Sequence, residues 1–360
     1  MLEVIGAAPN AHTDIDWPTV WRESPEYQAV QKELKRLSEH TDEKDSRTAT
    51  EDNDQSAYAE FAAGFRVQIH EVTKRVFQQY WRSPSYILSK SILTSGSALF
   101  IGLTLVGGSN TERGLRNQMF GVFIFLAMFG QVVQQIMPLF VSQRTMYEAR
   151  ERPAKSYSWK AFLAANIIVE MFWNSIMAVL SFLFWYYPIR LDRNAAWTDA
   201  VHSRAATLFL ICWAFFLFSS TFAHLMIAGL GSAEVAGGIM NLFFILMFAF
   251  CGVLAGPNEL PGFWIFMYRV NPFTYIMEGF LTVGLANAPV TCGYLIDGNA
   301  SECQFCGMAD TNAFLSGMNM SFENRWRDFG VVWAFCVFNV AAAAFLYWVA
   351  RVPRNDFKKK

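Results

Sequence analysis

Long apolar stretches separated by shorter polar segments dominate the chain from about residue 86 onward. Six of these stretches have about 20 residues or more, and a helix of that length, at about 1.5 Å per residue, crosses a hydrocarbon layer of about 30 Å. They predict membrane-spanning helices at 86–107, 117–141, 162–187, 205–229, 236–256 and 328–350. The pattern therefore predicts an all-α polytopic membrane protein with its membrane domain at residues 86–353.

Residues 1–62 are polar and hold no stretch long enough to span a bilayer. Within them, residues 25–39 repeat apolar side chains such as Tyr27 and Leu34 at helical spacing, which predicts a short amphipathic helix. Residues 40–54 hold almost no apolar side chain, so burial cannot offset the entropy cost of ordering them. We expect a cytoplasmic tail that includes a disordered linker.

A basic amphipathic segment, residues 63–85, precedes the first predicted span. Apolar side chains alternate there with basic ones such as Lys74 and Arg75, a pattern typical of a helix that lies on an anionic membrane surface. The segment is predicted to be an interfacial connecting helix. An extension of the next span on its cytoplasmic side is the alternative.

Lysine and arginine are concentrated before the first predicted span, after the second and after the sixth. The positive-inside rule places these segments in the cytoplasm, and six spans then put both termini there, including the basic tail 354–360. The residues are Lys74, Arg75, Arg82, Arg144, Arg150, Arg152, Lys155, Lys160, Arg351, Arg354 and Lys358–Lys360. A smaller set in the predicted outer loops opposes the assignment: Arg113, Arg116, Arg190, Arg193 and Arg204.

The predicted outer loop, residues 257–327, begins with an aromatic run at 261–287 that Pro272 interrupts. A seventh crossing would carry the basic C-terminus to the outside. The run therefore predicts a re-entrant or interfacial helical segment on the extracellular side.

The second half of this loop carries Cys292, Cys303 and Cys306, together with the Asn-x-Ser acceptor sites Asn299 and Asn319. Since the predicted topology places the loop in the secretory lumen, both asparagines are candidate glycosylation sites. A disulfide between two of the three cysteines is favoured over a zinc site, because the loop has no histidine and the compartment is oxidising.

Composition supports the membrane class and excludes others. Hydrophobic residues make up 53% of the chain and charged residues 16%, against about 25% charged in soluble globular proteins. A net charge of −1 gives no basis for binding nucleic acid through bulk positive charge. The 360 residues contain no GxxxxGK[ST] phosphate-binding loop, so we predict no nucleotide site, no catalytic residue and no metal site in them.

The segment after the second predicted span, residues 143–160, is rich in charge. Arg144, Glu148 and Arg152 stand four residues apart, so opposite charges would meet on one helical face, and Pro153 would end the helix. A short rigid helix beneath the membrane suits docking of a soluble partner. A solvated loop that only fixes the topology is the alternative.

Several polar side chains fall inside the predicted spans. Glu170 must face protein or water and is a candidate functional acid, whereas Lys90 is close enough to the inner end of its span to reach the interface. Gln131, Gln134 and Gln135 share one helical face. That face suits either a substrate route or hydrogen bonding between helices.

Four separated runs occur in a characteristic order: YEARERPAKSYSWKAF (Tyr147–Phe162), GFWIFMYRVNPFTYIMEG (Gly262–Gly279), CQFC (Cys303–Cys306) and FLYWVARVP (Phe345–Pro353). Together they resemble the second membrane domain of fungal pleiotropic-drug-resistance ABC transporters, and the likeness covers nearly all of the chain. MLEVIGAAP (Met1–Pro9) and DIDWPTVWRESPEY (Asp14–Tyr27) resemble the tail that follows the second nucleotide-binding domain in those pumps.

The resemblance implies a G-type ABC exporter fold with a coupling helix after the second span. It also implies that ATP and magnesium bind a partner nucleotide-binding domain, so that the chain is no enzyme by itself and binds no cofactor. Carried over by position, the residues that transmit force are Tyr147, Glu148, Arg150, Glu151 and Arg152. The implied substrate path is lined by Gln131, Gln134, Gln135, Asn241 and Phe244.

The implied partners are the lipid bilayer, a nucleotide-binding domain, a second membrane half and hydrophobic drugs or lipids. The implied location is the plasma membrane. Two alternatives remain at this point. One is a non-transporting membrane fragment or regulator that associates with intact exporters, and the other is a secondary carrier whose flux depends on Glu170.

Overall fold

The computed structural model describes residues 16–47, 60–106, 110–196, 198, 200–254, 256, 260–290 and 310–352. Contacts divide the chain into two compact units, residues 1–62 and 63–360, and each is described by itself. The predicted sites Cys292, Asn299, Cys303 and Cys306 lie outside the described residues.

The first unit contains two helices, α1 (Trp17–Glu23) and α2 (Pro25–Arg47). Ser24 separates them, and its hydroxyl accepts a hydrogen bond from the backbone N–H of Tyr27 at 3.2 Å. Pro25 occupies the first position of α2, where a missing N–H costs nothing. The helix runs past Glu39 and ends at Arg47, so it includes the first residues of the predicted linker.

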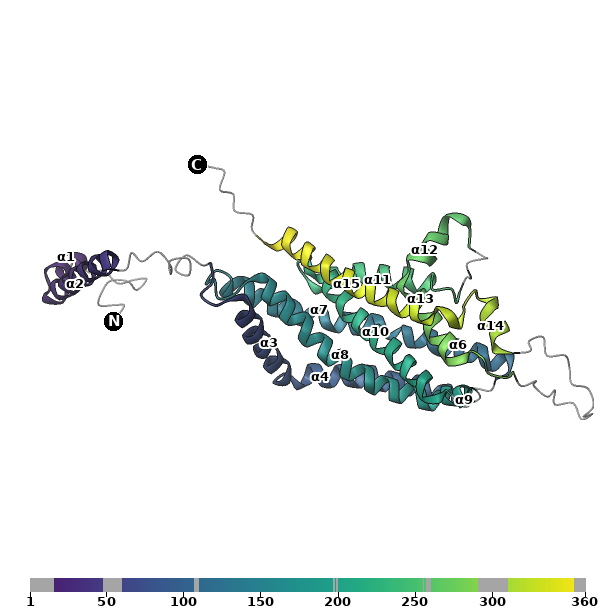
Figure 1. Cartoon of the computed structure of the whole chain (residues 1–360). Coiled ribbons are helices and arrows are strands. Elements are labelled where there is room, and N and C mark those ends of the chain that lie inside the picture. The colour runs from purple at the N-terminus through teal and green to yellow at the C-terminus, as the bar shows by residue number, and fades with distance from the viewer. Residues whose placement is uncertain are drawn as a thin grey trace, which may run out of the picture. The chain divides into compact units, whose positions relative to one another are not determined.

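The membrane unit is a bundle of helices (Figure 1). Its elements are α3 (Phe65–Trp81), α4 (Pro84–Ser91), η1 (Ile92–Gly96), α5 (Ser97–Thr104), α6 (Glu112–Leu126), α7 (Met128–Met146), η2 (Tyr147–Glu151), α8 (Trp159–Ile189), α9 (Leu191–Ala196), α10 (Val201–Ala228), α11 (Ala233–Ala249), η3 (Gly262–Trp264), α12 (Ile265–Val270), α13 (Pro272–Leu285), α14 (Thr311–Gly317), η4 (Phe322–Asn324) and α15 (Arg325–Arg351).

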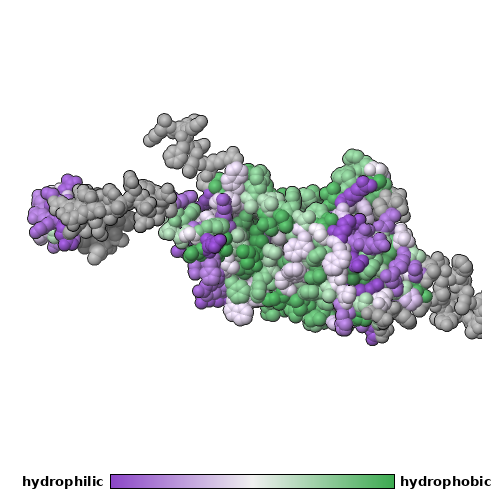
Figure 2. Space-filling view, viewed as in Figure 1, coloured by the Kyte–Doolittle hydropathy of each residue, from purple (hydrophilic) through white to green (hydrophobic). Residues whose placement is uncertain are grey.

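Among the described residues, five helices are long and apolar enough to cross a membrane, and they confirm five of the predicted spans. These are Pro84–Thr104, Glu112–Glu151, Trp159–Ile189, Val201–Ala228 and Phe322–Arg351. The chain is therefore a multi-pass, all-α membrane protein. Figure 2 shows the membrane unit with a broad hydrophobic band and hydrophilic side chains at both ends, as a bilayer requires.

The remaining predicted span, 236–256, corresponds to α11, which is apolar but ends at Ala249. Its 17 residues extend about 26 Å at 1.5 Å per residue. The predicted end was wrong because the chain turns at Gly252, whose φ of +91° suits glycine. The ring of Tyr268 would lie 2.8 Å from a Cβ at that position, so the turn also packs too closely for a side chain.

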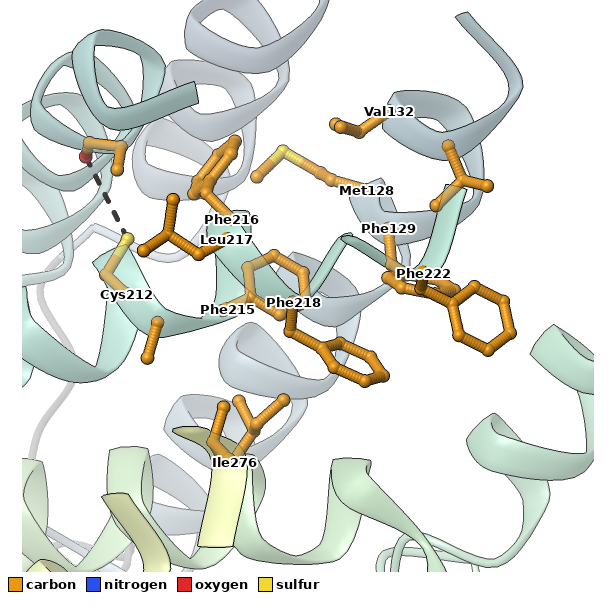
Figure 3. Packing of buried hydrophobic residues seen from close by; sticks show 14 of the residues in the cluster. Met128, Phe129, Val132, Cys212, Phe215, Phe216, Leu217, Phe218, Phe222 and Ile276 are labelled. Atoms are coloured by element: carbon orange, nitrogen blue, oxygen red, sulfur yellow. Dashed lines mark hydrogen bonds between the residues drawn. The ribbon is translucent and has the colours of Figure 1, made fainter. Parts of the chain in front are cut away.

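Helix α10 lies at the centre of the bundle and packs against α7, α8, α13 and α15. Phenylalanine rings from α10 meet Met128 and Phe129 of α7 in a continuous apolar core (Figure 3). Since lipid is as apolar as these side chains, burial alone does not hold the helices together. Close packing and polar contacts between helices must do so.

The aromatic run before the last span forms a pair of helices, α12 and α13, broken at Pro272 as predicted. Asn271 fixes the break, because its side chain accepts from the N–H of Phe273 at 3.0 Å and donates to the carbonyl of Met247 at 2.7 Å. Helix α13 is buried along its whole length between α10 and α15.

Replacing Gly102 with alanine should destabilise the membrane unit by about 1–3 kcal/mol. An added Cβ would lie 2.8 Å from the backbone oxygen of Phe184, where α5 crosses α8. Gly96→Ala is the matched control, since a Cβ there meets nothing within 4 Å. Thermal unfolding in detergent compares the two variants, and equal midpoints would contradict this close helix contact.

Candidate functional site

The predicted coupling residues lie on η2, a π-helical turn that continues α7 beyond the apolar span. The N–H of Arg152 donates to the carbonyl of Tyr147 at 2.9 Å, which is the wider hydrogen bond of such a turn. The helix ends before Pro153, as predicted. Because the wider turn changes the angular spacing of side chains, the predicted face of Arg144, Glu148 and Arg152 does not pair within itself, and each of the three binds another helix.

Glu151 joins η2 to α3. Its carboxylate accepts from both terminal nitrogens of Arg75 and from the hydroxyl of Tyr157. The guanidinium of Arg75 also donates to the Tyr157 hydroxyl at 2.8 Å. Burial, reinforced by the hydrogen bond to Glu151, raises the pKa of Tyr157, so this hydroxyl stays protonated and keeps donating.

Glu148 and Arg152 join η2 to the end of α15. The Glu148 carboxylate lies 3.6 Å from the guanidinium of Arg351 and accepts from the Tyr347 hydroxyl at 3.3 Å. Arg152 donates to the backbone oxygen of Arg351 at 2.6 Å. Arg351 in turn donates to the carbonyl of Leu230 at 2.7 Å, so the last span is tied to the end of α10 as well.

Arg144 fastens the end of α7 to the turn between α10 and α11. It is buried, and it donates to the carbonyls of Ile227 at 2.8 Å and Gly231 at 3.0 Å. Ile227 lies in the last turn of α10 and Gly231 in the turn that follows it, so Arg144 binds carbonyls at and just beyond a helix end. Tyr147 stacks on the ring of Phe162 at 4.7 Å, which packs η2 against the start of α8.

Arg150 differs from the other four predicted coupling residues. Its side chain is exposed and has no hydrogen bond or ion pair within the described part of the chain. The other four either stack in the core or join helices. We define the clamp as Arg75, Glu148, Glu151, Arg152, Tyr157, Tyr347 and Arg351.

The predicted lining residues lie on α7 and α11. Gln131, Gln134 and Asn241 are exposed, and Gln134 donates to the side-chain oxygen of Asn241 at 2.9 Å. Hydrogen bonding between helices, the alternative raised for this face, is thus present at Gln134. Gln135 is half-buried, and its side-chain oxygen has no partner among the described residues.

Phe244 is half-buried beside this polar face, and its ring lies 5.4 Å from that of Phe248 and 6.2 Å from that of Phe129. Exposed amides at the depth of a membrane span are costly against lipid, so contact with protein or water suits them better. We call Gln131, Gln134 and Asn241 the polar face.

Glu170 lies in a buried polar cluster deep in the bundle. It pairs with Lys90, and the two side chains are 0% and 1% exposed. Its carboxylate also accepts from the hydroxyls of Tyr80 at 2.8 Å and Tyr86 at 3.1 Å. The expectation that Lys90 reaches the interface was wrong, because Glu170 holds its ammonium inside the bundle.

The sequence argument missed Glu278 on α13, a second buried carboxylate that joins helices. It is buried, and it accepts from the Asn324 amide at 2.9 Å and from Arg327 at 3.2 Å. It is the one acidic residue in the apolar run 261–287, and that isolation was the signal available in the sequence.

The predicted glycosylation site Asn319 is exposed in a turn with φ of +58°. Within the described residues, no group of three or more possible metal ligands occurs.

The sequence profile of the ABC-2 type transporter family matches residues 67–284. The chain is 52% identical over 99% of its length to ABC multidrug transporter F of Aspergillus fumigatus. It is 50% identical over its full length to ABC multidrug transporter atrG of Aspergillus oryzae, and 52% identical over 98% to ABC-type transporter oblD of Aspergillus clavatus. It spans about a quarter of the length of these relatives, 26–27%.

Removing one partner of the buried pair should be far more damaging than removing both. Glu170→Leu alone leaves the Lys90 ammonium buried and unpaired, which should cost about 3–5 kcal/mol, whereas Lys90→Met combined with Glu170→Leu should cost much less. The surface pair of Arg116 and Glu112 is the control, since Glu112→Gln should change little. Thermal unfolding in detergent measures all three. A double variant as unstable as Glu170→Leu would contradict the assignment of Lys90 and Glu170 as a buried ion pair.

Proposed function

Because the chain belongs to the ABC-2 type transporter family, we propose that it serves as one membrane half of an ATP-driven exporter of hydrophobic compounds. The relatives named as multidrug transporters support this class of substrate. ATP and magnesium would bind a nucleotide-binding domain outside these residues. The chain itself would supply the path through the membrane and the surface on which that domain acts.

The proposed orientation places both termini in the cytoplasm at the plasma membrane. Residues 1–62 would follow a nucleotide-binding domain, 63–85 would be the connecting helix, 86–353 the membrane domain and 354–360 the basic tail. The basic segments around the clamp support this orientation. The loop 257–327 would then face outward and carry glycans at Asn299 and Asn319, with a disulfide among Cys292, Cys303 and Cys306.

The clamp is the observation that carries the proposal. Through Glu151 it joins η2 to α3, and through Glu148 and Arg152 it joins η2 to α15. A push on η2 would therefore move several helices together rather than bend one loop. Arg150 is exposed and uncommitted, so it would contact the moving nucleotide-binding domain, while Tyr147, Glu148, Glu151 and Arg152 would pass the motion on.

The polar face supports a meeting with a second membrane half. Gln131 and Gln134 on α7 and Asn241 on α11 are exposed in this half alone. A second half would cover them, or would enclose water and substrate between the two. Phe244 and Gln135 lie beside them and would complete an aromatic and amide lining for hydrophobic compounds.

Breaking the clamp should separate ATP hydrolysis from transport. With the chain coexpressed with a nucleotide-binding partner and a second half, Arg75→Ala should reduce vanadate-sensitive efflux of a hydrophobic dye about tenfold or more, since a charge-assisted hydrogen bond is lost. ATPase activity should fall much less. Efflux and ATPase rates on the same membranes measure both.

The matched control is Arg66→Ala, because Arg66 lies exposed on the same helix and its side chain makes no hydrogen bond or ion pair among the described residues. It should leave both rates unchanged. If the unaltered chain associates with exporters but supports no efflux, the regulator alternative replaces the proposal. If Arg75→Ala transports normally, the clamp does not transmit the motion.

A further inference from the structure

An open hollow of about 630 Å³ lies where the turn after η2 meets the end of α15. Its lining comes from both segments: Glu148, Arg152, Pro153, Lys155, Ala350, Arg351 and Val352. The clamp forms one wall of it. The wall is therefore held in place by contacts that do not depend on what fills the hollow.

Positive charge exceeds negative charge around the hollow. Arg152, Lys155 and Arg351 face a single carboxylate, that of Glu148. Glu148 is already balanced, because it lies 3.6 Å from Arg351 and accepts from Tyr347. The remaining positive charge is available to bind an anion.

Lys155 is the uncommitted cation of this set. Its side chain is exposed, and its ammonium makes no ion pair or hydrogen bond within the described residues. Its backbone is fixed, since it has φ of +49° and its N–H donates to the carbonyl of Arg152 at 3.0 Å. The turn thus places Lys155 at the hollow and leaves its ammonium without a partner among the described residues.

The hollow opens beside exposed apolar side chains of α15. Phe345 and Trp348 are exposed one to two turns before Arg351, and tryptophan is typical of the membrane interface. Ala350 and Val352 add apolar lining at the same level. The hollow therefore adjoins both the headgroup layer and the acyl chains.

We propose that this hollow binds the phosphate-bearing headgroup of an anionic phospholipid. Guanidinium groups bind phosphate oxygens through paired N–H donors, and lysine adds a point charge. Basic pockets beside spanning helices on the cytoplasmic side suit such headgroups. A free phosphate compound would use the charge but not the adjoining apolar surface. The choice of leaflet rests on the proposed orientation, but binding itself does not.

The test uses the full chain purified in detergent and three probes, with binding measured by thermophoresis. Dioctanoyl phosphatidylinositol 4-phosphate should bind more than about tenfold tighter than dioctanoyl phosphatidylcholine. Soluble inositol 1,4-bisphosphate should bind more weakly than the anionic lipid, because it lacks acyl chains. Lys155→Ala should weaken binding of the anionic lipid about fivefold, and Lys155→Arg should retain it.

Lys74→Ala is the matched control, since Lys74 is an exposed lysine of α3 outside the hollow. It should bind as the unaltered chain does. Equal affinity of Lys155→Ala and Lys74→Ala, or equal affinity for the two lipids, overturns the proposal. Equal binding of the soluble bisphosphate assigns the site to a free phosphate compound instead.

Cross-linking of Lys155 to a nucleotide-binding protein, with no anionic lipid bound, would assign the hollow to a protein contact and overturn the proposal. No efflux enters these measurements. Failure here therefore leaves the proposed transport function untouched, and failure of transport leaves this binding result intact.

Discussion

A carboxylate removed from water must receive hydrogen bonds or a counter-charge from the protein, and in this membrane unit that requirement joins helices. Glu170 draws donors from α3 and α4, and Glu278 draws them from the segment that starts α15. Glu148 and Glu151 do the same where η2 meets α15 and α3. Apolar helix faces gain little by leaving lipid for one another, so these four acids specify which helices are joined by polar contacts.

As a consequence, some helices of the bundle are joined by polar contacts, whereas one polar surface has no protein over it in the described part of the chain. The clamp holds η2 against α3 and α15, while the polar face on α7 and α11 is exposed. Motion applied at Arg150 would reach the polar face through the continuous helix from α7 into η2. A lipid headgroup bound in the hollow beside Lys155 would stabilise the same contact between η2 and α15 from the membrane side.

Hydropathy predicted the spans well, because crossing a bilayer imposes a length and composition that single stretches reveal. It failed where tertiary contacts determine the end of a helix. Helix α11 ends before the turn at Gly252, which packs closely against Tyr268. The spacing of charges on 143–160 suggested pairs within one helix, whereas the π-helical turn sends them to other helices. Partners distant in sequence, such as Lys90 for Glu170, have no signature in local pattern.

The most direct test of the account is the distance between spin labels at positions 150 and 74 in the assembled, ATP-cycling protein. A clamped η2 predicts the same distance with and without vanadate trapping, while a label pair between this half and its partner half changes. A shift between positions 150 and 74 that accompanies the change between halves would contradict the claim that η2 and α3 move as one body.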